Sequence, residues 1–135
     1  MSTSRVITTV IGVVVIVFMI LMAPNHRSPS QRIADDNANE AAVLAAAREA
    51  AAKLDGVEGN PSIQDVEAVL PSGFQVTGGG RSRSGGIERD GSMSSTDTVE
   101  ITDADGVHHA CLTVETTFRN FTYEPASVRA DAGAC

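Results

Sequence analysis

The sequence predicts an α+β protein in which an N-terminal transmembrane helix precedes an alanine-rich helix packed on a small antiparallel sheet. Three observations predict this class. Residues 6–23 form an uncharged apolar run, residues 41–52 are mostly alanine, and apolar and polar residues alternate in the second half of the chain. A length of 135 residues allows one modest domain in addition to the apolar run.

The apolar run reads VITTVIGVVVIVFMILMA and occupies residues 6–23. At about 1.5 Å per helical residue, this length can cross a hydrocarbon core of roughly 30 Å. We interpret it as a transmembrane helix that follows a cytoplasmic N-terminus of residues 1–5. A cleaved secretory signal peptide is the alternative, but Met22 and Pro24 fit poorly around a small-x-small cleavage site.

The charges at the two ends of the run bear on its orientation. Arg5 precedes the run, whereas Arg27 and Arg32 follow it. The short N-terminus still favours a cytoplasmic location for that end. We therefore expect a single-pass protein of the cell membrane, with a juxtamembrane linker at residues 24–31 and an extracytoplasmic α+β domain at residues 32–135.

The part of the chain after the apolar run is acidic and poor in large apolar residues. It contains all 17 Asp and Glu residues and all but one of the 10 Lys and Arg residues. Such a surface disfavours binding to nucleic acid.

A domain with a small core often needs a covalent crosslink or a partner. Its aromatic residues are Phe74, Phe118, Phe121 and Tyr123.

An alanine-rich helix is expected to begin after Ser28. Ser28 and Gln31 have the spacing of a capping box, and Pro29 occupies the first helical position. Residues 41–52 contain mainly alanine, the best helix former, and Gly56 supplies a C-terminal stop. The apolar face is narrow and consists mostly of methyl groups, which would let a sheet approach closely. It contains Val43, Leu44, Ala47, Ala51 and Leu54.

Three segments connect this helix to the alternating part of the chain. Residues 63–70 read as a short helix with Val66, Val69 and Leu70 on one side. Residues 74–77 read as a first strand. Residues 78–97 are dominated by glycine and serine, and this composition predicts a flexible loop.

Two alternating segments, at residues 98–102 and 107–118, predict a β-hairpin. Asp105 and Gly106 between them suit a two-residue type I′ turn. A four-residue loop that starts at Asp103 would keep the same residues on each face, because the side-chain period of a strand is two. The two-residue turn would place Ile101 opposite Ala110 and Val99 opposite Leu112.

The second strand of this hairpin would divide its residues between two faces. His109 and Cys111 would lie on the outer face. We expect the tail at residues 120–135 to include a short strand at 121–123 and a polar end that cannot form a core alone. The inner face would contain Ala110, Leu112, Val114 and Phe118.

The stretch VHHAC at residues 107–111 is a candidate metal site. Because adjacent strand residues point to opposite faces, His108 and His109 cannot easily bind one metal ion. His109 and Cys111 share a face but provide only two of the three or four ligands that a site needs. We therefore favour a Cys111–Cys135 disulfide, with both imidazoles facing solvent, over a metal-dependent redox site at His109 and Cys111.

No other residues are arranged for chemistry that the sequence reveals. Serine, cysteine and carboxylate side chains lack visible partners for nucleophilic or acid–base catalysis. We therefore expect no catalytic, cofactor-binding or metal-binding residues, no cofactor and no small-molecule substrate.

The order of elements resembles the type IV pilin-like architecture. The motifs NEAA at residues 39–42 and AREAAA at 47–52, a Gly-rich stretch and alternating strands that end in aromatic residues resemble the TadE-like pseudopilins of tight-adherence pilus systems. The resemblance covers roughly residues 38–123 and implies a role in assembly. The chain departs from the pilin pattern because its apolar run has no glutamate and Pro24 follows the run.

These observations lead to one main functional expectation. We expect a non-enzymatic, membrane-anchored envelope protein that acts in assembly, with the lipid bilayer and other envelope proteins as its partners. The alternative is an anchored accessory subunit or binding module of a larger membrane complex. Such a module would use the Gly/Ser/Arg-rich segment or the polar face of the hairpin.

Overall fold

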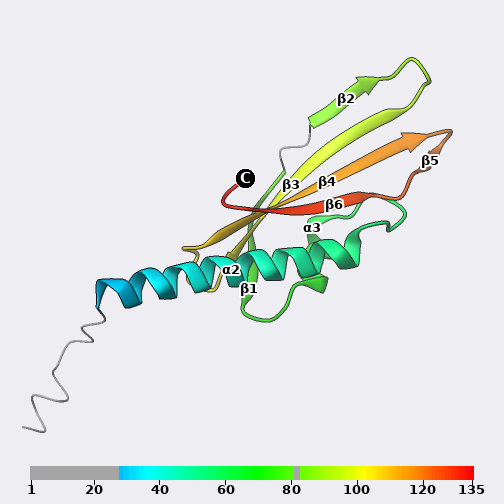
Figure 1. The fold of residues 1–135 in the computed structure, drawn as a ribbon. Coiled ribbons are helices and arrows are strands. Elements are labelled where there is room, and N and C mark those ends of the chain that lie inside the picture. The colour runs from blue at the N-terminus through cyan, green and yellow to red at the C-terminus, as the bar shows by residue number, and fades with distance from the viewer. Residues whose placement is uncertain (1–27, 81–82) are drawn as a thin grey trace, which may run out of the picture. The chain divides into compact units, whose positions relative to one another are not determined.

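The computed structural model describes residues 28–80 and 83–135, and it has the predicted α+β class: one long helix packs on a curled antiparallel sheet (Figure 1). Short helix α3 and two long central strands complete the framework. The elements are α2 (Pro29–Leu54), α3 (Ile63–Val69), β1 (Phe74–Gly79), β2 (Arg83–Ile87), β3 (Met93–Asp103), β4 (His109–Arg119), β5 (Thr122–Tyr123) and β6 (Ser127–Ala132).

The chain divides into two compact units, Met1–Ala34 and Asp35–Cys135. The fold is that of the second unit, and only residues 28–34 of the first are described. Among the described residues, no helix combines the length and apolarity needed to cross a bilayer. The cytoplasmic segment expected at residues 1–5 and the transmembrane helix expected at 6–23 lie outside the described residues.

Helix α2 has the ends that the sequence predicts. The Gln31 backbone N–H donates to Ser28 Oγ at 3.3 Å, and the Ser28 N–H donates to Gln31 Oε1 at 3.1 Å, which completes the capping box. Gly56 follows the helix with a φ of +78°, a conformation that glycine adopts without steric cost. Because α2 begins at Pro29, the last residues of the expected linker at 24–31 are helical.

The second half of α2 forms one side of the core, whereas the side chains of residues 28–42 are exposed. The predicted apolar face is confirmed, except that Leu44 is only half-buried. Most of its buried side chains are single methyl groups, and its larger buried side chains are Val43 and Leu54. The buried residues of α2 are Val43, Ala46, Ala47, Ala50, Ala51 and Leu54.

The hairpin of β3 and β4 forms the centre of the sheet. The predicted register is confirmed, because Ile101 lies opposite Ala110 and Val99 lies opposite Leu112. The connection is wider than a two-residue turn, since the Asp103 N–H donates to the His108 carbonyl at 3.3 Å and four residues separate them. On either side, β1 and β2 pair with β3, and β5 and β6 pair with β4, all antiparallel.

The expected flexible loop at residues 78–97 is wrong. The first strand continues to Gly79, β2 pairs with β3, and β3 already begins at Met93. At Gly85, β2 lies very close to β3. A Cβ atom added to Gly85 would lie 2.6 Å from Ser94 Oγ, so glycine, which has no side chain, suits this position. The glycines that suggested a loop therefore allow a second edge strand to lie against β3.

The short strand expected at 121–123 is β5, but the tail also forms a second strand, β6, which was not expected. Strand β6 pairs with β4, and it places Val128 in the core. The Val128 N–H donates to Asp55 Oδ1 at 2.9 Å, and the Gly56 N–H donates to the Ala126 carbonyl at 2.8 Å. These bonds attach the segment after α2 to the tail, which explains why a sequence with few large apolar residues forms a strand.

The core lies between α2, α3 and the inner face of the sheet. Helix α3 begins with a capping box of Ser62 and Asp65. It contributes Val66, which is fully buried. Val69 and the next residue, Leu70, are partly buried against the same core, so the three residues lie on one side as predicted. Besides the α2 residues, the core contains Val66, Val99, Ile101, Ala110, Leu112, Val114, Ala126 and Val128.

A disulfide joins Cys111 of β4 to Cys135, across a sequence separation of 24 residues. Cys111 lies on the outer face of the sheet, next to the buried inner-face residues Ala110 and Leu112. The bond therefore crosslinks the tail to the central strand from the side that α2 does not cover.

Reduction of this disulfide is expected to lower the free energy of unfolding by about 3 kcal/mol, because the bond restricts a loop of this length in the unfolded chain. Urea titration of the oxidised and reduced protein measures the difference. The C111S/C135S double variant is the control, and it should match the reduced protein. Equal midpoints for oxidised and reduced protein would contradict a stabilising crosslink.

Candidate functional site

The stretch VHHAC lies where the β3–β4 turn enters β4, and its two imidazoles differ in how far they are exposed to solvent. The His108 side chain is 14% exposed, and the His109 side chain is 34% exposed. His109 Nδ1 lies 2.6 Å from Glu100 Oε1, an ion pair when the imidazole is protonated. The solvent-facing interpretation is wrong for His108, which is largely buried, whereas His109 remains about one-third exposed.

His108 lies between two carboxylates from different elements. Its Nδ1 is 2.6 Å from Asp103 Oδ2, at the end of β3, and its Nε2 is 3.0 Å from Asp36 Oδ1, on α2. Asp103 is also held in place, because its Oδ1 accepts a hydrogen bond from the Val107 N–H at 3.0 Å. The imidazole therefore links the turn of the hairpin to the exposed first half of α2.

These contacts change the proton affinity of both partners. The hydrogen bond to Asp103, followed by the one to Asp36, raises the pKa of His108 above its ordinary value of 6.5. The hydrogen bond from His108 holds the pKa of Asp103 below its ordinary value of 3.8. The protonated His108 imidazole beside an ionised Asp103 carboxylate is thus favoured over a wider pH range than for the isolated groups.

The disulfide removes Cys111 as a ligand of the alternative redox metal site at His109 and Cys111. The Cys111 sulfur is bonded to Cys135, so it is not a thiolate that could bind a metal ion. Within residues 28–80 and 83–135, no three His, Cys, Asp or Glu side chains form a group that could hold a metal ion.

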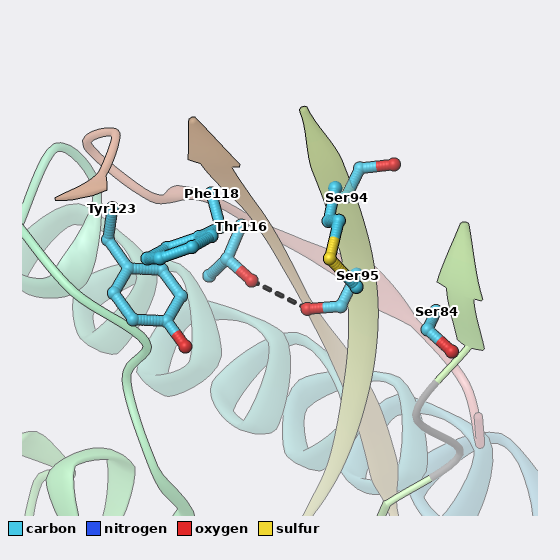
Figure 2. Close-up of a pocket in the computed structure, with 7 residues that line it drawn as sticks. Ser84, Ser94, Ser95, Thr116, Phe118 and Tyr123 are labelled. Atoms are coloured by element: carbon cyan, nitrogen blue, oxygen red, sulfur yellow. Dashed lines mark hydrogen bonds between the residues drawn. The ribbon is translucent and has the colours of Figure 1, made fainter. Parts of the chain in front are cut away.

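A groove of about 250 Å³ lies at the opposite end of the hairpin (Figure 2). Phe118 and Tyr123 form one side of it, with ring centroids 5.0 Å apart in an edge-to-face arrangement, and the Ser84 hydroxyl lies on the other side. We call it the β2–β5 groove. Its lining residues are Ser84, Met93, Ser94, Ser95, Thr116, Phe118 and Tyr123.

The groove combines an apolar row with hydroxyl groups. Ile87 pairs with Met93, Met93 with Phe118, and Phe118 with Tyr123, so four large apolar residues cross the sheet side by side. The hydroxyls of Ser95 and Thr116 hydrogen-bond to each other at 2.7 Å (Figure 2). No charged side chain lines the groove in the part of the chain that the structure describes, so an uncharged ligand suits it best.

Several of these apolar side chains face solvent. Ile87 is 74% exposed, and Tyr123 is 48% exposed. Phe121, in the turn between β4 and β5, is 94% exposed and has a φ of +63°. That conformation is uncommon for a bulky residue and is disfavoured by about 1–2 kcal/mol. A group of neighbouring exposed apolar side chains is typical of an interaction surface.

The sequence contains one signal that could have located the groove. Extending the predicted hairpin register towards the N-terminus of β3 places Met93 opposite Phe118, as observed. The expectation of a loop at 78–97 concealed this pair. Of the Gly/Ser/Arg-rich segment considered for docking, Arg81 lies outside the described residues and Arg89 is exposed in the connection between β2 and β3.

Neither protein-family models nor curated proteins nor solved structures give a match to this chain.

Proposed function

We propose that this chain is a single-pass, membrane-anchored envelope protein whose small extracytoplasmic α+β domain acts in assembly as a non-enzymatic, pseudopilin-like component. The position of α2 carries the proposal. The helix begins at Pro29, shortly after the apolar run at residues 6–23, and its second half forms one side of the domain core. An apolar segment, a long alanine-rich helix and a sheet packed on that helix follow the pilin-like order of elements.

The disulfide gives independent support for an extracytoplasmic domain. Both cysteines of the chain, Cys111 and Cys135, take part in it. Disulfides persist mainly in oxidising compartments outside the cytoplasm.

Membrane fractionation combined with protease treatment of intact spheroplasts tests this proposal. The chain should sediment with membranes, and a C-terminal tag should be digested from outside, because the domain would follow an N-inside anchor. An N-terminal tag on the same chain is the matched control and should be protected. A soluble chain, or a C-terminal tag that resists digestion until the membrane is broken, would contradict the proposal.

The β2–β5 groove favours a second candidate, an anchored binding module of a larger membrane complex. Its walls are apolar and hydroxyl-bearing. Arg119, which follows the lining residue Phe118 on β4, is paired with Asp90 at 3.2 Å and with Glu124 at 3.4 Å. We therefore infer that the occupant is an uncharged aromatic or aliphatic side chain of another envelope protein. A volume of about 250 Å³ suits one or two such side chains better than a drug-sized ligand.

Photo-crosslinking in the native host distinguishes the two candidates. A photoreactive side chain at Tyr123 should give one discrete adduct, and the M93S substitution should reduce its yield by about tenfold because it removes apolar contact from the groove. The same probe at Gln75, exposed on β1, is the control and should give no such adduct. A pilus component in the adduct would favour the assembly role, whereas a component of another complex would favour the binding module. Equal yields at both positions would exclude the groove as a docking site.

A further inference from the structure

We propose that Asp36, His108 and Asp103 form a proton-operated latch, which holds the first half of α2 on the β3–β4 turn when His108 is protonated and releases it when His108 is neutral. This inference does not rest on the proposed function, because it depends only on contacts within Asp35–Cys135. It would hold equally for an assembly component and for a binding module.

The hydrogen-bonding capacity of the His108 imidazole depends on its protonation state. Both ring nitrogens of His108 face carboxylate oxygens, at 2.6 Å and 3.0 Å. An ionised carboxylate only accepts hydrogen bonds, and a neutral imidazole has a single N–H to donate. Both contacts can therefore be hydrogen bonds only when the ring is protonated.

The two carboxylates are not equivalent when the ring loses a proton. Asp103 is 19% exposed, and it also accepts hydrogen bonds from the backbone N–H groups of Val107 and His108. Asp36 is 74% exposed. The remaining proton is therefore best placed on Nδ1, where it bonds to Asp103. The lone pair of Nε2 then faces the Asp36 carboxylate, and this repulsion favours separation of Asp36 from the turn.

The part of α2 around Asp36 depends on such a contact. Every side chain of residues 35–42 is exposed, so this segment adds nothing to the apolar core. In Figure 1 the β3–β4 turn lies beside this half of α2. Loss of the Asp36 contact would therefore loosen the helix before Val43 while the packed second half stays in place.

The charged groups around the latch set the direction of its response. On α2, Asp36 follows Asp35 and lies four residues from both Arg32 and Glu40, and the turn contributes Asp105. The charged groups that act on His108 are Asp103 and Asp36. Because the pKa of His108 is raised, the latch is fully formed below pH 6.5 and is lost as the pH rises through the raised value. Because the pKa of Asp103 is lowered, its contribution is lost only as the pH falls below 3.8 through the lowered value.

Hydrogen exchange of the full chain tests the latch. After correction for intrinsic exchange, amides of residues 36–42 should be about fivefold less protected at about pH 9 than at about pH 5, the effect expected for one lost hydrogen bond. Amides of β3 and β4 should not change. The D36A variant keeps the turn and the core, and it should show the low protection at both pH values.

The matched control is H109Q, which alters the neighbouring imidazole on the other face of β4 and should retain the wild-type response. Titration of the His108 ring by NMR provides a second measurement, and its pKa should be lower in D36A than in the wild type. Equal protection of residues 36–42 at both pH values in the wild type would overturn the proposal. A pH response that persists in D36A would also overturn it.

Discussion

The packing of the methyl-bearing face of α2 on the inner face of the β3–β4 hairpin is the contact on which the rest of the structure depends. Alanine contributes little apolar area per residue, so much of the apolar area buried in this contact comes from the larger side chains of the sheet. The larger core residues, Ile101 and Leu112, lie on the sheet and are fully buried against this face. Helix α3 and strand β6 close the sides of the core, and the disulfide fixes the tail from the outer face.

A difference in length between the two packed elements accounts for both candidate sites. Strands β3 and β4 have 11 residues each and extend about 36 Å at roughly 3.3 Å per residue. The buried part of α2, from Val43 to Leu54, extends only about 18 Å. The hairpin therefore projects beyond the buried helix, with the β2–β5 groove at one end and the turn that contacts Asp36 through His108 at the other.

The sequence predicts those features that depend on local periodicity. The capping box at Ser28, the buried face of α2 and the pairing of Ile101 with Ala110 all follow from spacing within one or two neighbouring elements. The remaining features depend on contacts between distant segments. Composition cannot reveal that the Gly/Ser-rich segment pairs with a nearby strand, and a separation of 72 residues hides the Asp36–His108 contact. The disulfide was accessible from sequence because the chain contains only 2 cysteines.

The functional proposals share a requirement that the second half of α2 stays packed on the sheet. An anchored domain presents its groove at a fixed position only if this part of the helix and the sheet move together. The latch likewise needs a fixed second half of α2 against which the first half can loosen. Each role therefore rests on the packing of the alanine face on the hairpin.

The most direct test of that claim compares the unfolding free energies of two alanine-to-leucine variants of α2. Ala47 is fully buried in the core, whereas Ala45, two residues earlier, is exposed. We expect Ala47→Leu to destabilise the fold by about 1–3 kcal/mol, because the added carbons have no space. Ala45→Leu should change stability by less than about 0.5 kcal/mol. If both variants were equally stable, or if Ala47→Leu were stabilising, α2 would not pack on the sheet through this face.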